Sequence, residues 1–305
     1  MMTLVDRIEE IISAAGIDAG VAVWHIESDT RLDVQGETPF PMASTFKVPI
    51  LATACRQLAA GVISLDSRVP LADEDKSLGS GILPYFEAGL APTLRDLLTL
   101  MIIISDNTAT DMVVDTLGGA SVVEDYMREL GLPEISFKLN CKDLLRYAFP
   151  PEVADLPAEE LVKWAAKNDI LRDGLCFSRG PENNVSTANA MNRLLLLMYG
   201  DLFPEDVRAV AFDILRKQQY KQRIARFLPL GVKVASKTGT IGGIRNDCGI
   251  IALGEANHVI LTLFTEWDEA PIWNQPVAYH QRVFEVETAM GAIGRAVYDE
   301  FLGAD

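Results

Sequence analysis

The hydrophobic and polar positions divide the chain into two β-rich stretches near its ends and a long helical middle. Apolar residues spaced three and four apart between residues 3 and 15 predict an amphipathic helix, which Gly16 ends. Short runs rich in β-branched and apolar residues predict strands. We expect a helix at 3–15, strands at 20–26, 31–35, 232–240, 247–254 and 258–266, and a final helix at about 277–302.

Between these stretches the apolar positions follow helical spacing. The segment 45–60 is apolar on nearly every face, which is typical of a buried helix. Thr93 has the context of an N-cap for a second apolar helix that runs through Ile104. Further helices are expected before Leu117, at 121–130, 158–167 and 204–217, and after Ser186-Thr187.

Two early and three late strands most simply form one antiparallel sheet. We therefore predict an α+β fold (an α/β sandwich), in which a five-stranded antiparallel sheet is flanked by the N- and C-terminal helices. The expected sheet domain comprises residues 1–43 and 231–305, and an all-helical domain, 44–230, is inserted between them.

Composition excludes several classes of function. The 305 residues include 43 acidic and 27 basic side chains, a net charge of −16 that argues against nucleic-acid binding. The apolar runs are too short to span a membrane, and the N-terminus lacks the basic and apolar regions of a signal peptide. This indicates a cytoplasmic location as written, although a trimmed periplasmic or secreted protein would read the same. Scattered cysteines and histidines predict no metal site, no cofactor and no required disulfide.

One polar cluster lies at the start of the predicted helix 45–60. Ser44 and Lys47 are three residues apart, so a helical turn places them on one face. A hydroxyl and an amine in this arrangement can exchange a proton, as a serine nucleophile requires. By itself the same spacing is more often a helix cap followed by a solvated lysine.

Two further clusters lie at other junctions between elements. Ser105-Asp106-Asn107 joins two helices, and Lys237-Thr238-Gly239-Thr240 lies on the first late strand. A hydroxyl beside an amide can pass a proton and hold a substrate, and a lysine on an open strand can bind a carboxylate. Each cluster alone is an ordinary cap or turn.

In this order and at these junctions, the three clusters resemble the signature motifs of class A β-lactamases and penicillin-binding proteins. The resemblance covers the Ser44 helix, the 61-residue step to Ser105, the strand that carries Lys237, and both terminal helices. It implies a β-lactamase/transpeptidase-like fold with the active site in the cleft between the two domains.

The resemblance also implies roles for individual residues. Ser44 would be the acylated nucleophile with Lys47 as its base, and Ser105 would relay the proton to the leaving nitrogen. Asn107 would contact the substrate amide. Lys237 and Arg245 would bind the substrate carboxylate. The strand beside the substrate would be lined by Thr238, Gly239 and Thr240. The backbone N–H groups of Ser44 and Thr240 would form the oxyanion hole.

The chain departs from the family between the second and third motifs, where hydrolytic members carry a glutamate that primes the deacylating water. Asp143 and Glu182 are the candidates for that base, and each is also read as a solvated surface carboxylate. The stretch from Ser105 to Lys237 is longer than in typical members, which predicts a rebuilt loop at 140–185.

We therefore expect a serine β-lactamase-like hydrolase that opens β-lactam amides through an acyl-enzyme on Ser44. Two alternatives remain open. One is an intracellular serine esterase, amidase or D,D-peptidase-like enzyme with slow deacylation, and the other is a non-catalytic penicillin-binding-type protein. In each case the expected partner is a small β-lactam, amide or ester, with no nucleic acid or membrane partner, and a monomer is favoured.

Overall fold

The computed structural model describes residues 2–165, 167–169 and 171–303. Residue 166 of the predicted helix at 158–167, residue 170 and the termini of the predicted sheet domain (1, 304 and 305) lie outside the described residues. The chain forms two compact units. The first comprises Met1–Thr45, Ser186–Leu202 and Leu215–Asp305, and the second comprises Phe46–Val185 and Phe203–Ile214. The expected helical domain, 44–230, thus spans the second unit and segments that belong to the first.

The first unit is built on a five-stranded antiparallel sheet in the order β2-β1-β7-β6-β5. This confirms the predicted fold class. The strands are β1 (Asp18–His25), β2 (Thr30–Val34), β5 (Val234–Ile241), β6 (Ile244–Ala252) and β7 (His258–Glu266).

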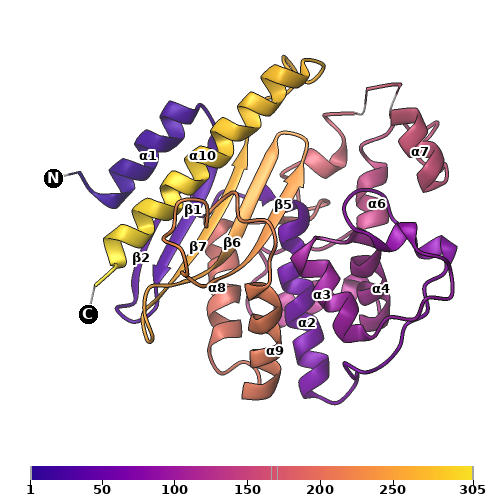
Figure 1. Ribbon diagram of the computed structural model, residues 1–305, viewed down its shortest axis with the longest axis horizontal. Coiled ribbons are helices and arrows are strands. Elements are labelled where there is room, and N and C mark those ends of the chain that lie inside the picture. The colour runs from indigo at the N-terminus through magenta and orange to yellow at the C-terminus, as the bar shows by residue number, and fades with distance from the viewer. Residues whose placement is uncertain (1, 166, 170, 304–305) are drawn as a thin grey trace. The chain divides into compact units, whose positions relative to one another are not determined.

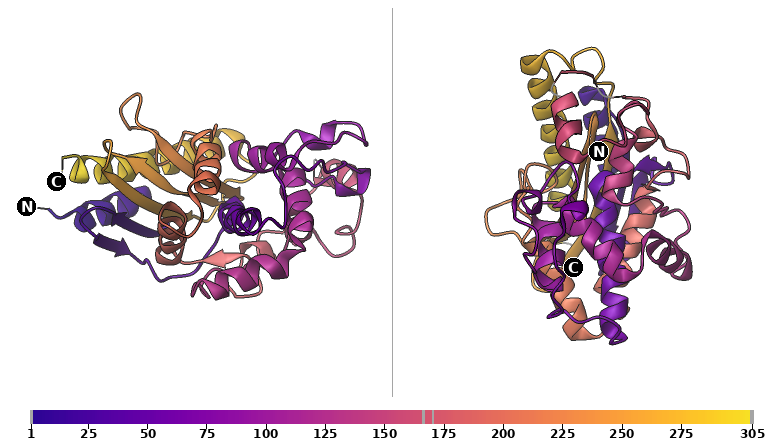
Figure 2. Two further views of the ribbon diagram at one scale, coloured as in Figure 1. Left: turned by 90° about the horizontal axis from the view of Figure 1, so that it is seen from below. Right: turned by 90° about the vertical axis from the view of Figure 1, so that its right-hand side faces the viewer.

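Helices pack against both faces of this sheet. Helices α1 (Leu4–Ala15) and α10 (Pro276–Phe301) lie side by side across one face, and α8 (Ala188–Tyr199) packs against the other (Figures 1 and 2). Alternate residues of the central strands, such as Val21 and Leu261, enter the core beneath α1 and α10. Because the central strands are covered on both faces, their sequences read as nearly continuous apolar runs.

The first helix was predicted at 3–15 and spans Leu4–Ala15, with a physical cause at each end. Thr3 and Asp6 form a reciprocal capping box at its N-terminus. Gly16 ends it in a left-handed conformation with φ 57°.

The second unit is helical. In chain order it contains α2 (Lys47–Ala59), α3 (Leu94–Ile103), α4 (Asn107–Leu117), α5 (Ala120–Glu129), α6 (Cys141–Arg146), α7 (Ala158–Ala165) and most of α9 (Glu205–Arg216). Every residue of α2 from Lys47 to Cys55 is buried, which confirms the prediction of a buried central helix. The described residues also form two short strands, β3 (Phe40–Pro41) and β4 (Val185–Ser186).

The start of α2 differs from the sequence-based prediction. A 3₁₀ turn over Ala43–Phe46 precedes the helix, which begins at Lys47. Ala43 has φ 44°, a left-handed conformation that an α-helix cannot contain, and Thr45 N–H donates to the Met42 carbonyl at 3.1 Å. Ser44 therefore lies in a tight turn before the helix instead of in its first regular turn.

Among the described residues, no helix combines the length and the apolar composition needed to cross a bilayer.

Asp247 on β6 is a buried carboxylate within the first unit. Its Oδ2 accepts a hydrogen bond from Ile224 N–H at 3.2 Å, and among the described residues its Oδ1 has no hydrogen-bond partner. Burial raises the pKa of Asp247 to about 7, against the opposing attraction of the Arg223 guanidinium.

This raised pKa predicts that Asp247 destabilises the fold as pH increases. Between about pH 4 and pH 7 the unfolded state has released the proton while the folded state retains it, so stability falls across that interval. Asn cannot ionise, and we therefore expect the stability advantage of Asp247→Asn over the parent to grow by on the order of 3 kcal/mol across the interval and then level off. Urea unfolding at a series of pH values measures it, with exposed Glu255→Gln as the control. A pH-independent difference between Asp247→Asn and the parent would contradict the assignment.

Candidate active site

Ser44 is the partly exposed residue in an otherwise buried segment. Residues 40–43 and 45–55 are all buried, whereas the Ser44 side chain is half-buried. The segment is tied to β6, because the Asn246 side-chain amide donates to the carbonyls of Pro41 at 2.8 Å and Met42 at 3.0 Å. The fold thus presents one hydroxyl from a rigid, buried stretch, as a nucleophile requires.

Gly239 brings the backbone of β5 against the Ser44 turn. A Cβ at position 239 would lie 2.7 Å from the Met42 carbonyl oxygen and 3.1 Å from the amide nitrogen of Ser44. Contacts this short exclude a side chain, which explains the glycine in the Lys237-Thr238-Gly239 motif. The role of the Ser44 and Thr240 N–H groups as an oxyanion hole stays a prediction.

Arg223 organises the end of β5, and the sequence analysis did not find it. Its guanidinium donates to the carbonyls of Gly239 at 2.7 Å and Asn246 at 2.6 Å, and to Thr240 Oγ1 at 2.5 Å. Glu287 lies 3.3 Å away and offsets its charge. Arg223 is buried but belongs to an irregular segment without a motif, so its sequence context gave no signal.

The other cations of the late strands are buried as well. Lys237 is fully buried and its Nζ donates to the Thr238 carbonyl at 2.7 Å. Arg245 donates to the carbonyls of Gly242 and Ile244 and stacks over the Trp267 ring at 5.0 Å. Arg245 is therefore held within the first unit, unlike a solvated hairpin side chain. Carboxylate binding by either residue stays a prediction.

In the second unit, Lys47 hydrogen-bonds to the Ser105-Asp106-Asn107 motif. Its Nζ donates to the Ser105 carbonyl at 2.8 Å, to Ser105 Oγ at 3.0 Å and to Asn107 Oδ1 at 2.8 Å. The buried ammonium at the start of α2 is thereby bound to the junction of α3 and α4. The structure brings Lys47, Ser105 and Asn107 together, and their catalytic roles stay predictions.

The α3–α4 junction is held in an unusual backbone conformation. Ser105 has φ 59°, which is uncommon for a residue with a side chain. Asp106 caps α4 through Ala109 N–H at 2.8 Å, and its other carboxylate oxygen accepts from Ile82 N–H at 2.7 Å and Leu83 N–H at 2.9 Å. The middle residue of the Ser-Asp-Asn motif therefore positions its neighbours and the preceding loop.

That loop also contacts the catalytic candidates directly. The Asn107 side-chain amide donates to the Leu78 carbonyl at 2.7 Å, and Asn107 N–H donates to the Ser80 carbonyl at 2.9 Å. Ser80 Oγ donates to the Ser105 carbonyl at 2.6 Å. Both polar atoms of the Asn107 side chain are thus fixed, one by Lys47 and one by the loop.

The environment of Lys47 makes it easier to deprotonate. Burial lowers the pKa of its ammonium, while negative charge at Cys141, Asp111 or Asp106 acts in the opposite direction. An amine whose pKa is lowered is more often neutral near physiological pH, and a neutral amine can accept a proton. Lys47 is therefore suited to act as a general base.

Asp111 and Cys141 form a buried pair that the sequence analysis did not single out. Asp111 accepts from Ser77 Oγ at 2.6 Å, Cys141 N–H at 2.7 Å and Lys142 N–H at 2.9 Å, so it anchors the start of α6. Burial raises the pKa of the Asp111 carboxyl and, together with the charge of Asp111, raises that of the Cys141 thiol. The position of Asp111, one helical turn after Asn107, was the available signal.

The two candidates for a deacylation base lie in solvent-accessible positions. The Asp143 side chain is 49% exposed and lies 3.6 Å from the Arg146 guanidinium, and Glu182 is exposed. Neither hydrogen-bonds to Lys47 among the described residues, where the acceptors are Ser105 and Asn107. A catalytic role for either stays a prediction.

The described residues contain no group of three or more His, Cys, Asp or Glu side chains arranged to hold a metal ion. All four cysteines are free and buried.

Comparison with known proteins identifies the family. The model of the β-lactamase enzyme family matches residues 3–301, and the chain therefore belongs to that family. This confirms the resemblance seen in the three motifs and makes the protein a β-lactamase-like hydrolase.

Individual relatives agree across nearly the whole chain. β-Lactamase VEB-1 from Pseudomonas aeruginosa is 24% identical over 271 residues, 85% of this chain and 80% of the relative. The crystal structure of a β-lactamase from Sphaerobacter thermophilus DSM 20745 is 27% identical, with a TM-score of 0.76 over 98% of this chain and 97% of that one. The penicillin G acyl-enzyme complex of a leucine-to-glutamate mutant of PBP-A is 23% identical, with a TM-score of 0.75 over 98% and 96% of the two chains, and shares the fold.

The hydrogen bonds that Asp106 accepts can be tested by replacing this residue. Asp106→Ala leaves the buried N–H groups of Leu83 and Ala109, and the partly buried one of Ile82, without their acceptor, so we expect a loss of about 2–4 kcal/mol in the free energy of unfolding. Asp115→Ala is the matched control, since Asp115 is an exposed aspartate on the same helix and should change stability by less than about 0.5 kcal/mol. Urea unfolding measures both, and equal losses would contradict the role given to Asp106.

Proposed function

We propose that the protein is a serine hydrolase of β-lactam amides that forms an acyl-enzyme on Ser44. The main support is the buried Lys47 amine. It donates hydrogen bonds to Ser105 Oγ and Asn107 Oδ1, and burial lowers its pKa. Such an amine can take the proton of a serine hydroxyl and pass it on through Ser105.

In the proposed acylation, Ser44 Oγ attacks the lactam carbonyl carbon while Lys47 accepts the hydroxyl proton. The tetrahedral intermediate then breaks the lactam C–N bond, and the nitrogen receives a proton through Ser105, 3.0 Å from Lys47 Nζ. The N–H groups of Ser44 and Thr240 would stabilise the oxyanion.

The cations of the first unit suit a substrate that carries a carboxylate. Lys237 and Arg245 are buried next to the strand edge that Thr240 occupies, and the buried Arg223 holds Thr240 Oγ1. A buried cation favours an anionic partner, because its own hydration has already been lost. We propose that Lys237 and Arg245 bind the substrate carboxylate and that Arg223 positions Thr240.

Deacylation is proposed to be slow. A water molecule needs a base to attack the acyl-enzyme. The ionisable groups whose charge affects the pKa of Lys47 are the Cys141 thiol, whose own pKa is raised, and the Asp106 and Asp111 carboxylates, which accept hydrogen bonds from backbone N–H groups. The same fold carries a penicillin G acyl-enzyme in the PBP-A mutant. A penicillin-binding enzyme with weak turnover is therefore the form of the activity we favour.

An esterase or amidase is the second candidate, because an activated ester could acylate Ser44 equally well with the help of Lys47 and Ser105. Initial rates with short-chain p-nitrophenyl esters and with nitrocefin separate the two. Faster acylation by esters than by every β-lactam tested would favour this alternative. A non-catalytic binding protein would give no covalent adduct with either class.

Ser44→Ala tests the nucleophile. We expect benzylpenicillin to add one intact molecule to the parent, observed by intact-mass spectrometry, and to add nothing to Ser44→Ala, which lacks the attacking oxygen. The adduct on the parent should persist through desalting, because deacylation is proposed to be slow. Ser13→Ala, an exposed serine on α1, is the control that should label normally. A labelled Ser44→Ala protein, or an unlabelled folded parent, would refute the proposal.

The lowered pKa of Lys47 predicts the pH dependence of acylation. The rate should rise with pH as the ammonium deprotonates, with a midpoint below the 10.5 of an ordinary lysine. Lys47→Arg should lose acylation by at least about a hundredfold at every pH, since a guanidinium keeps its proton. Stopped-flow acylation with nitrocefin measures both, and exposed Lys233→Arg should behave as the parent. A pH-independent acylation rate would exclude Lys47 as the base.

A further inference from the structure

Asp111 is a buried acid of the second unit that takes no part in the acylation steps proposed above. It lies four residues after Asn107 on α4, and side chains four residues apart lie on one face of a helix, with their Cβ atoms about 5–6 Å apart. Asn107 Oδ1 accepts a hydrogen bond from Lys47 Nζ at 2.8 Å. Asp111 therefore lies on the face of α4 that meets the Lys47 ammonium, one turn further along the helix.

Three hydrogen bonds favour the ionised form of Asp111. Its Oδ1 accepts from Cys141 N–H at 2.7 Å, and its Oδ2 accepts from Lys142 N–H at 2.9 Å and from Ser77 Oγ at 2.6 Å. Backbone N–H groups can only donate, and a carboxylate accepts such bonds better than a protonated acid does. Burial raises the pKa of Asp111, and these hydrogen bonds act against that rise. The contacts thus suit a buried carboxylate.

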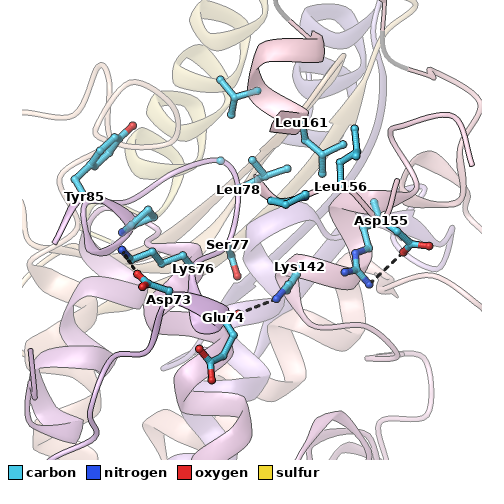
Figure 3. Close-up of a pocket in the computed structure, with 15 residues that line it drawn as sticks. Asp73, Glu74, Lys76, Ser77, Leu78, Tyr85, Lys142, Asp155, Leu156 and Leu161 are labelled. Carbon is cyan, nitrogen blue, oxygen red and sulfur yellow. Dashed lines mark hydrogen bonds and ion pairs between the residues drawn. The ribbon is translucent and has the colours of Figure 1, made fainter. Parts of the chain in front are cut away.

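The negative charge of this carboxylate is not neutralised by a contact ion pair. The donors that reach Asp111 within the described part of the chain are uncharged groups. Lys142, whose N–H binds Asp111, extends its side chain toward Glu74, and its Nζ donates to the Glu74 carbonyl at 2.7 Å (Figure 3). The buried Lys47 ammonium supplies an opposite charge one helical turn away, and buried charges are only weakly screened from each other.

Two other ionisable groups act on the Lys47 ammonium, namely Asp106 at the α3–α4 junction and Cys141 at the start of α6. Burial and the charge of Asp111 raise the pKa of the Cys141 thiol well above its ordinary value, so this thiol carries no charge near neutral pH. With the thiol uncharged, Asp111 attracts the ammonium most strongly, ahead of Asp106.

We propose that Asp111 is a positioning residue for Lys47, and that the charge of its carboxylate sets the pH at which the amine can accept a proton. The proposal rests on the function proposed above and adds a residue to its acid–base step. Burial favours the neutral amine and the carboxylate favours the ammonium, so the two effects oppose each other. Asp111 acts through Lys47 and needs no contact with the substrate.

The titration of Lys47 tests the proposal without a substrate. In protein labelled with lysine enriched in carbon-13 at Cε, the Lys47 signal is the one that Lys47→Arg lacks, and its chemical shift follows protonation. Asp111→Asn removes the charge and keeps the shape of the side chain. We expect the pKa of Lys47 to fall by at least about one pH unit in Asp111→Asn, because a nearby opposite charge typically moves a pKa by about one to three pH units.

Two matched variants separate charge from structure. Asp115→Asn removes the same charge from an exposed position of the same helix, and Cys141→Ala removes the buried thiol but keeps the N–H group that binds Asp111. We expect each variant to keep the pKa of Lys47 within about 0.3 pH units of the parent, since solvent screens Asp115 and the thiol is uncharged.

The pH profile of acylation is the functional readout. The midpoint of the nitrocefin acylation rate should move to lower pH in Asp111→Asn by the same interval as the pKa of Lys47. Well below the midpoint, its rate relative to its own plateau should exceed that of the parent by at least about tenfold. A merely structural role would lower the rate at every pH and leave the midpoint in place.

The outcomes separate this proposal from the function on which it rests. If the pKa of Lys47 falls by less than about one pH unit in Asp111→Asn, or rises, the role of Asp111 is wrong and the acyl-enzyme function stands. An equal fall in Cys141→Ala would make the thiol the counter-charge and would overturn the proposal too. If the parent is not acylated, the proposed function is wrong, and the Lys47 titration still decides the role of Asp111.

A measurement on the parent decides the case in which Asp111→Asn does not fold. The carbon-13 shift of Asp111 Cγ reports whether the carboxyl is ionised over the pH range in which Lys47 titrates. An ionised carboxyl throughout that range supports the proposal, because only a charged Asp111 can act on the ammonium in this way. A carboxyl that stays protonated there refutes it.

Discussion

The second unit depends on a buried ammonium group that has exchanged water for three fixed oxygen atoms. Lys47 loses its hydration entirely, and the oxygens of Ser105 and Asn107 replace it only because α2, α3 and α4 are held in register. The cost of burying the charge appears as a lowered pKa, which is the property that an acid–base catalyst needs. The contacts that hold α2, α3 and α4 together therefore also define the buried surroundings that lower the pKa of Lys47. The left-handed Ser105 and the cap made by Asp106 belong to this arrangement, since they direct those oxygens toward the amine.

In the first unit, several contacts hold the turn that carries Ser44 while the Ser44 side chain stays partly accessible. The Asn246 side chain fixes the carbonyls that precede Ser44, and the absence of a side chain at Gly239 lets a strand approach the turn at backbone distance. Arg223 then ties the carbonyls of Gly239 and Asn246 together. Small changes at these positions would move the Ser44 amide without altering the Ser44 side chain itself.

The fold and the motif residues could be predicted from the sequence because their signals are local. Alternating and helical apolar patterns gave the sheet, its flanking helices and the buried α2, and Gly16 marked the end of the first helix. The long-range supports could not be predicted. Arg223 and Asp247 lie in segments where one sequence cannot distinguish a buried ion from a solvated one, because only the tertiary fold decides their burial. The start of α2 was displaced for a related reason, since the left-handed Ala43 is imposed by contacts with β5 and β6.

The loop between the second and third motifs is fastened at both ends. Asp111 binds the amides of Cys141 and Lys142 near its start, and paired hydrogen bonds between Ser136 and Val185, at 2.8 and 3.1 Å, close its base. The described residues between these anchors supply none of the oxygens that accept hydrogen bonds from Lys47 Nζ, which belong to Ser105 and Asn107. The length and sequence of this segment can therefore change over evolution while the oxygens that surround the Lys47 amine stay in place.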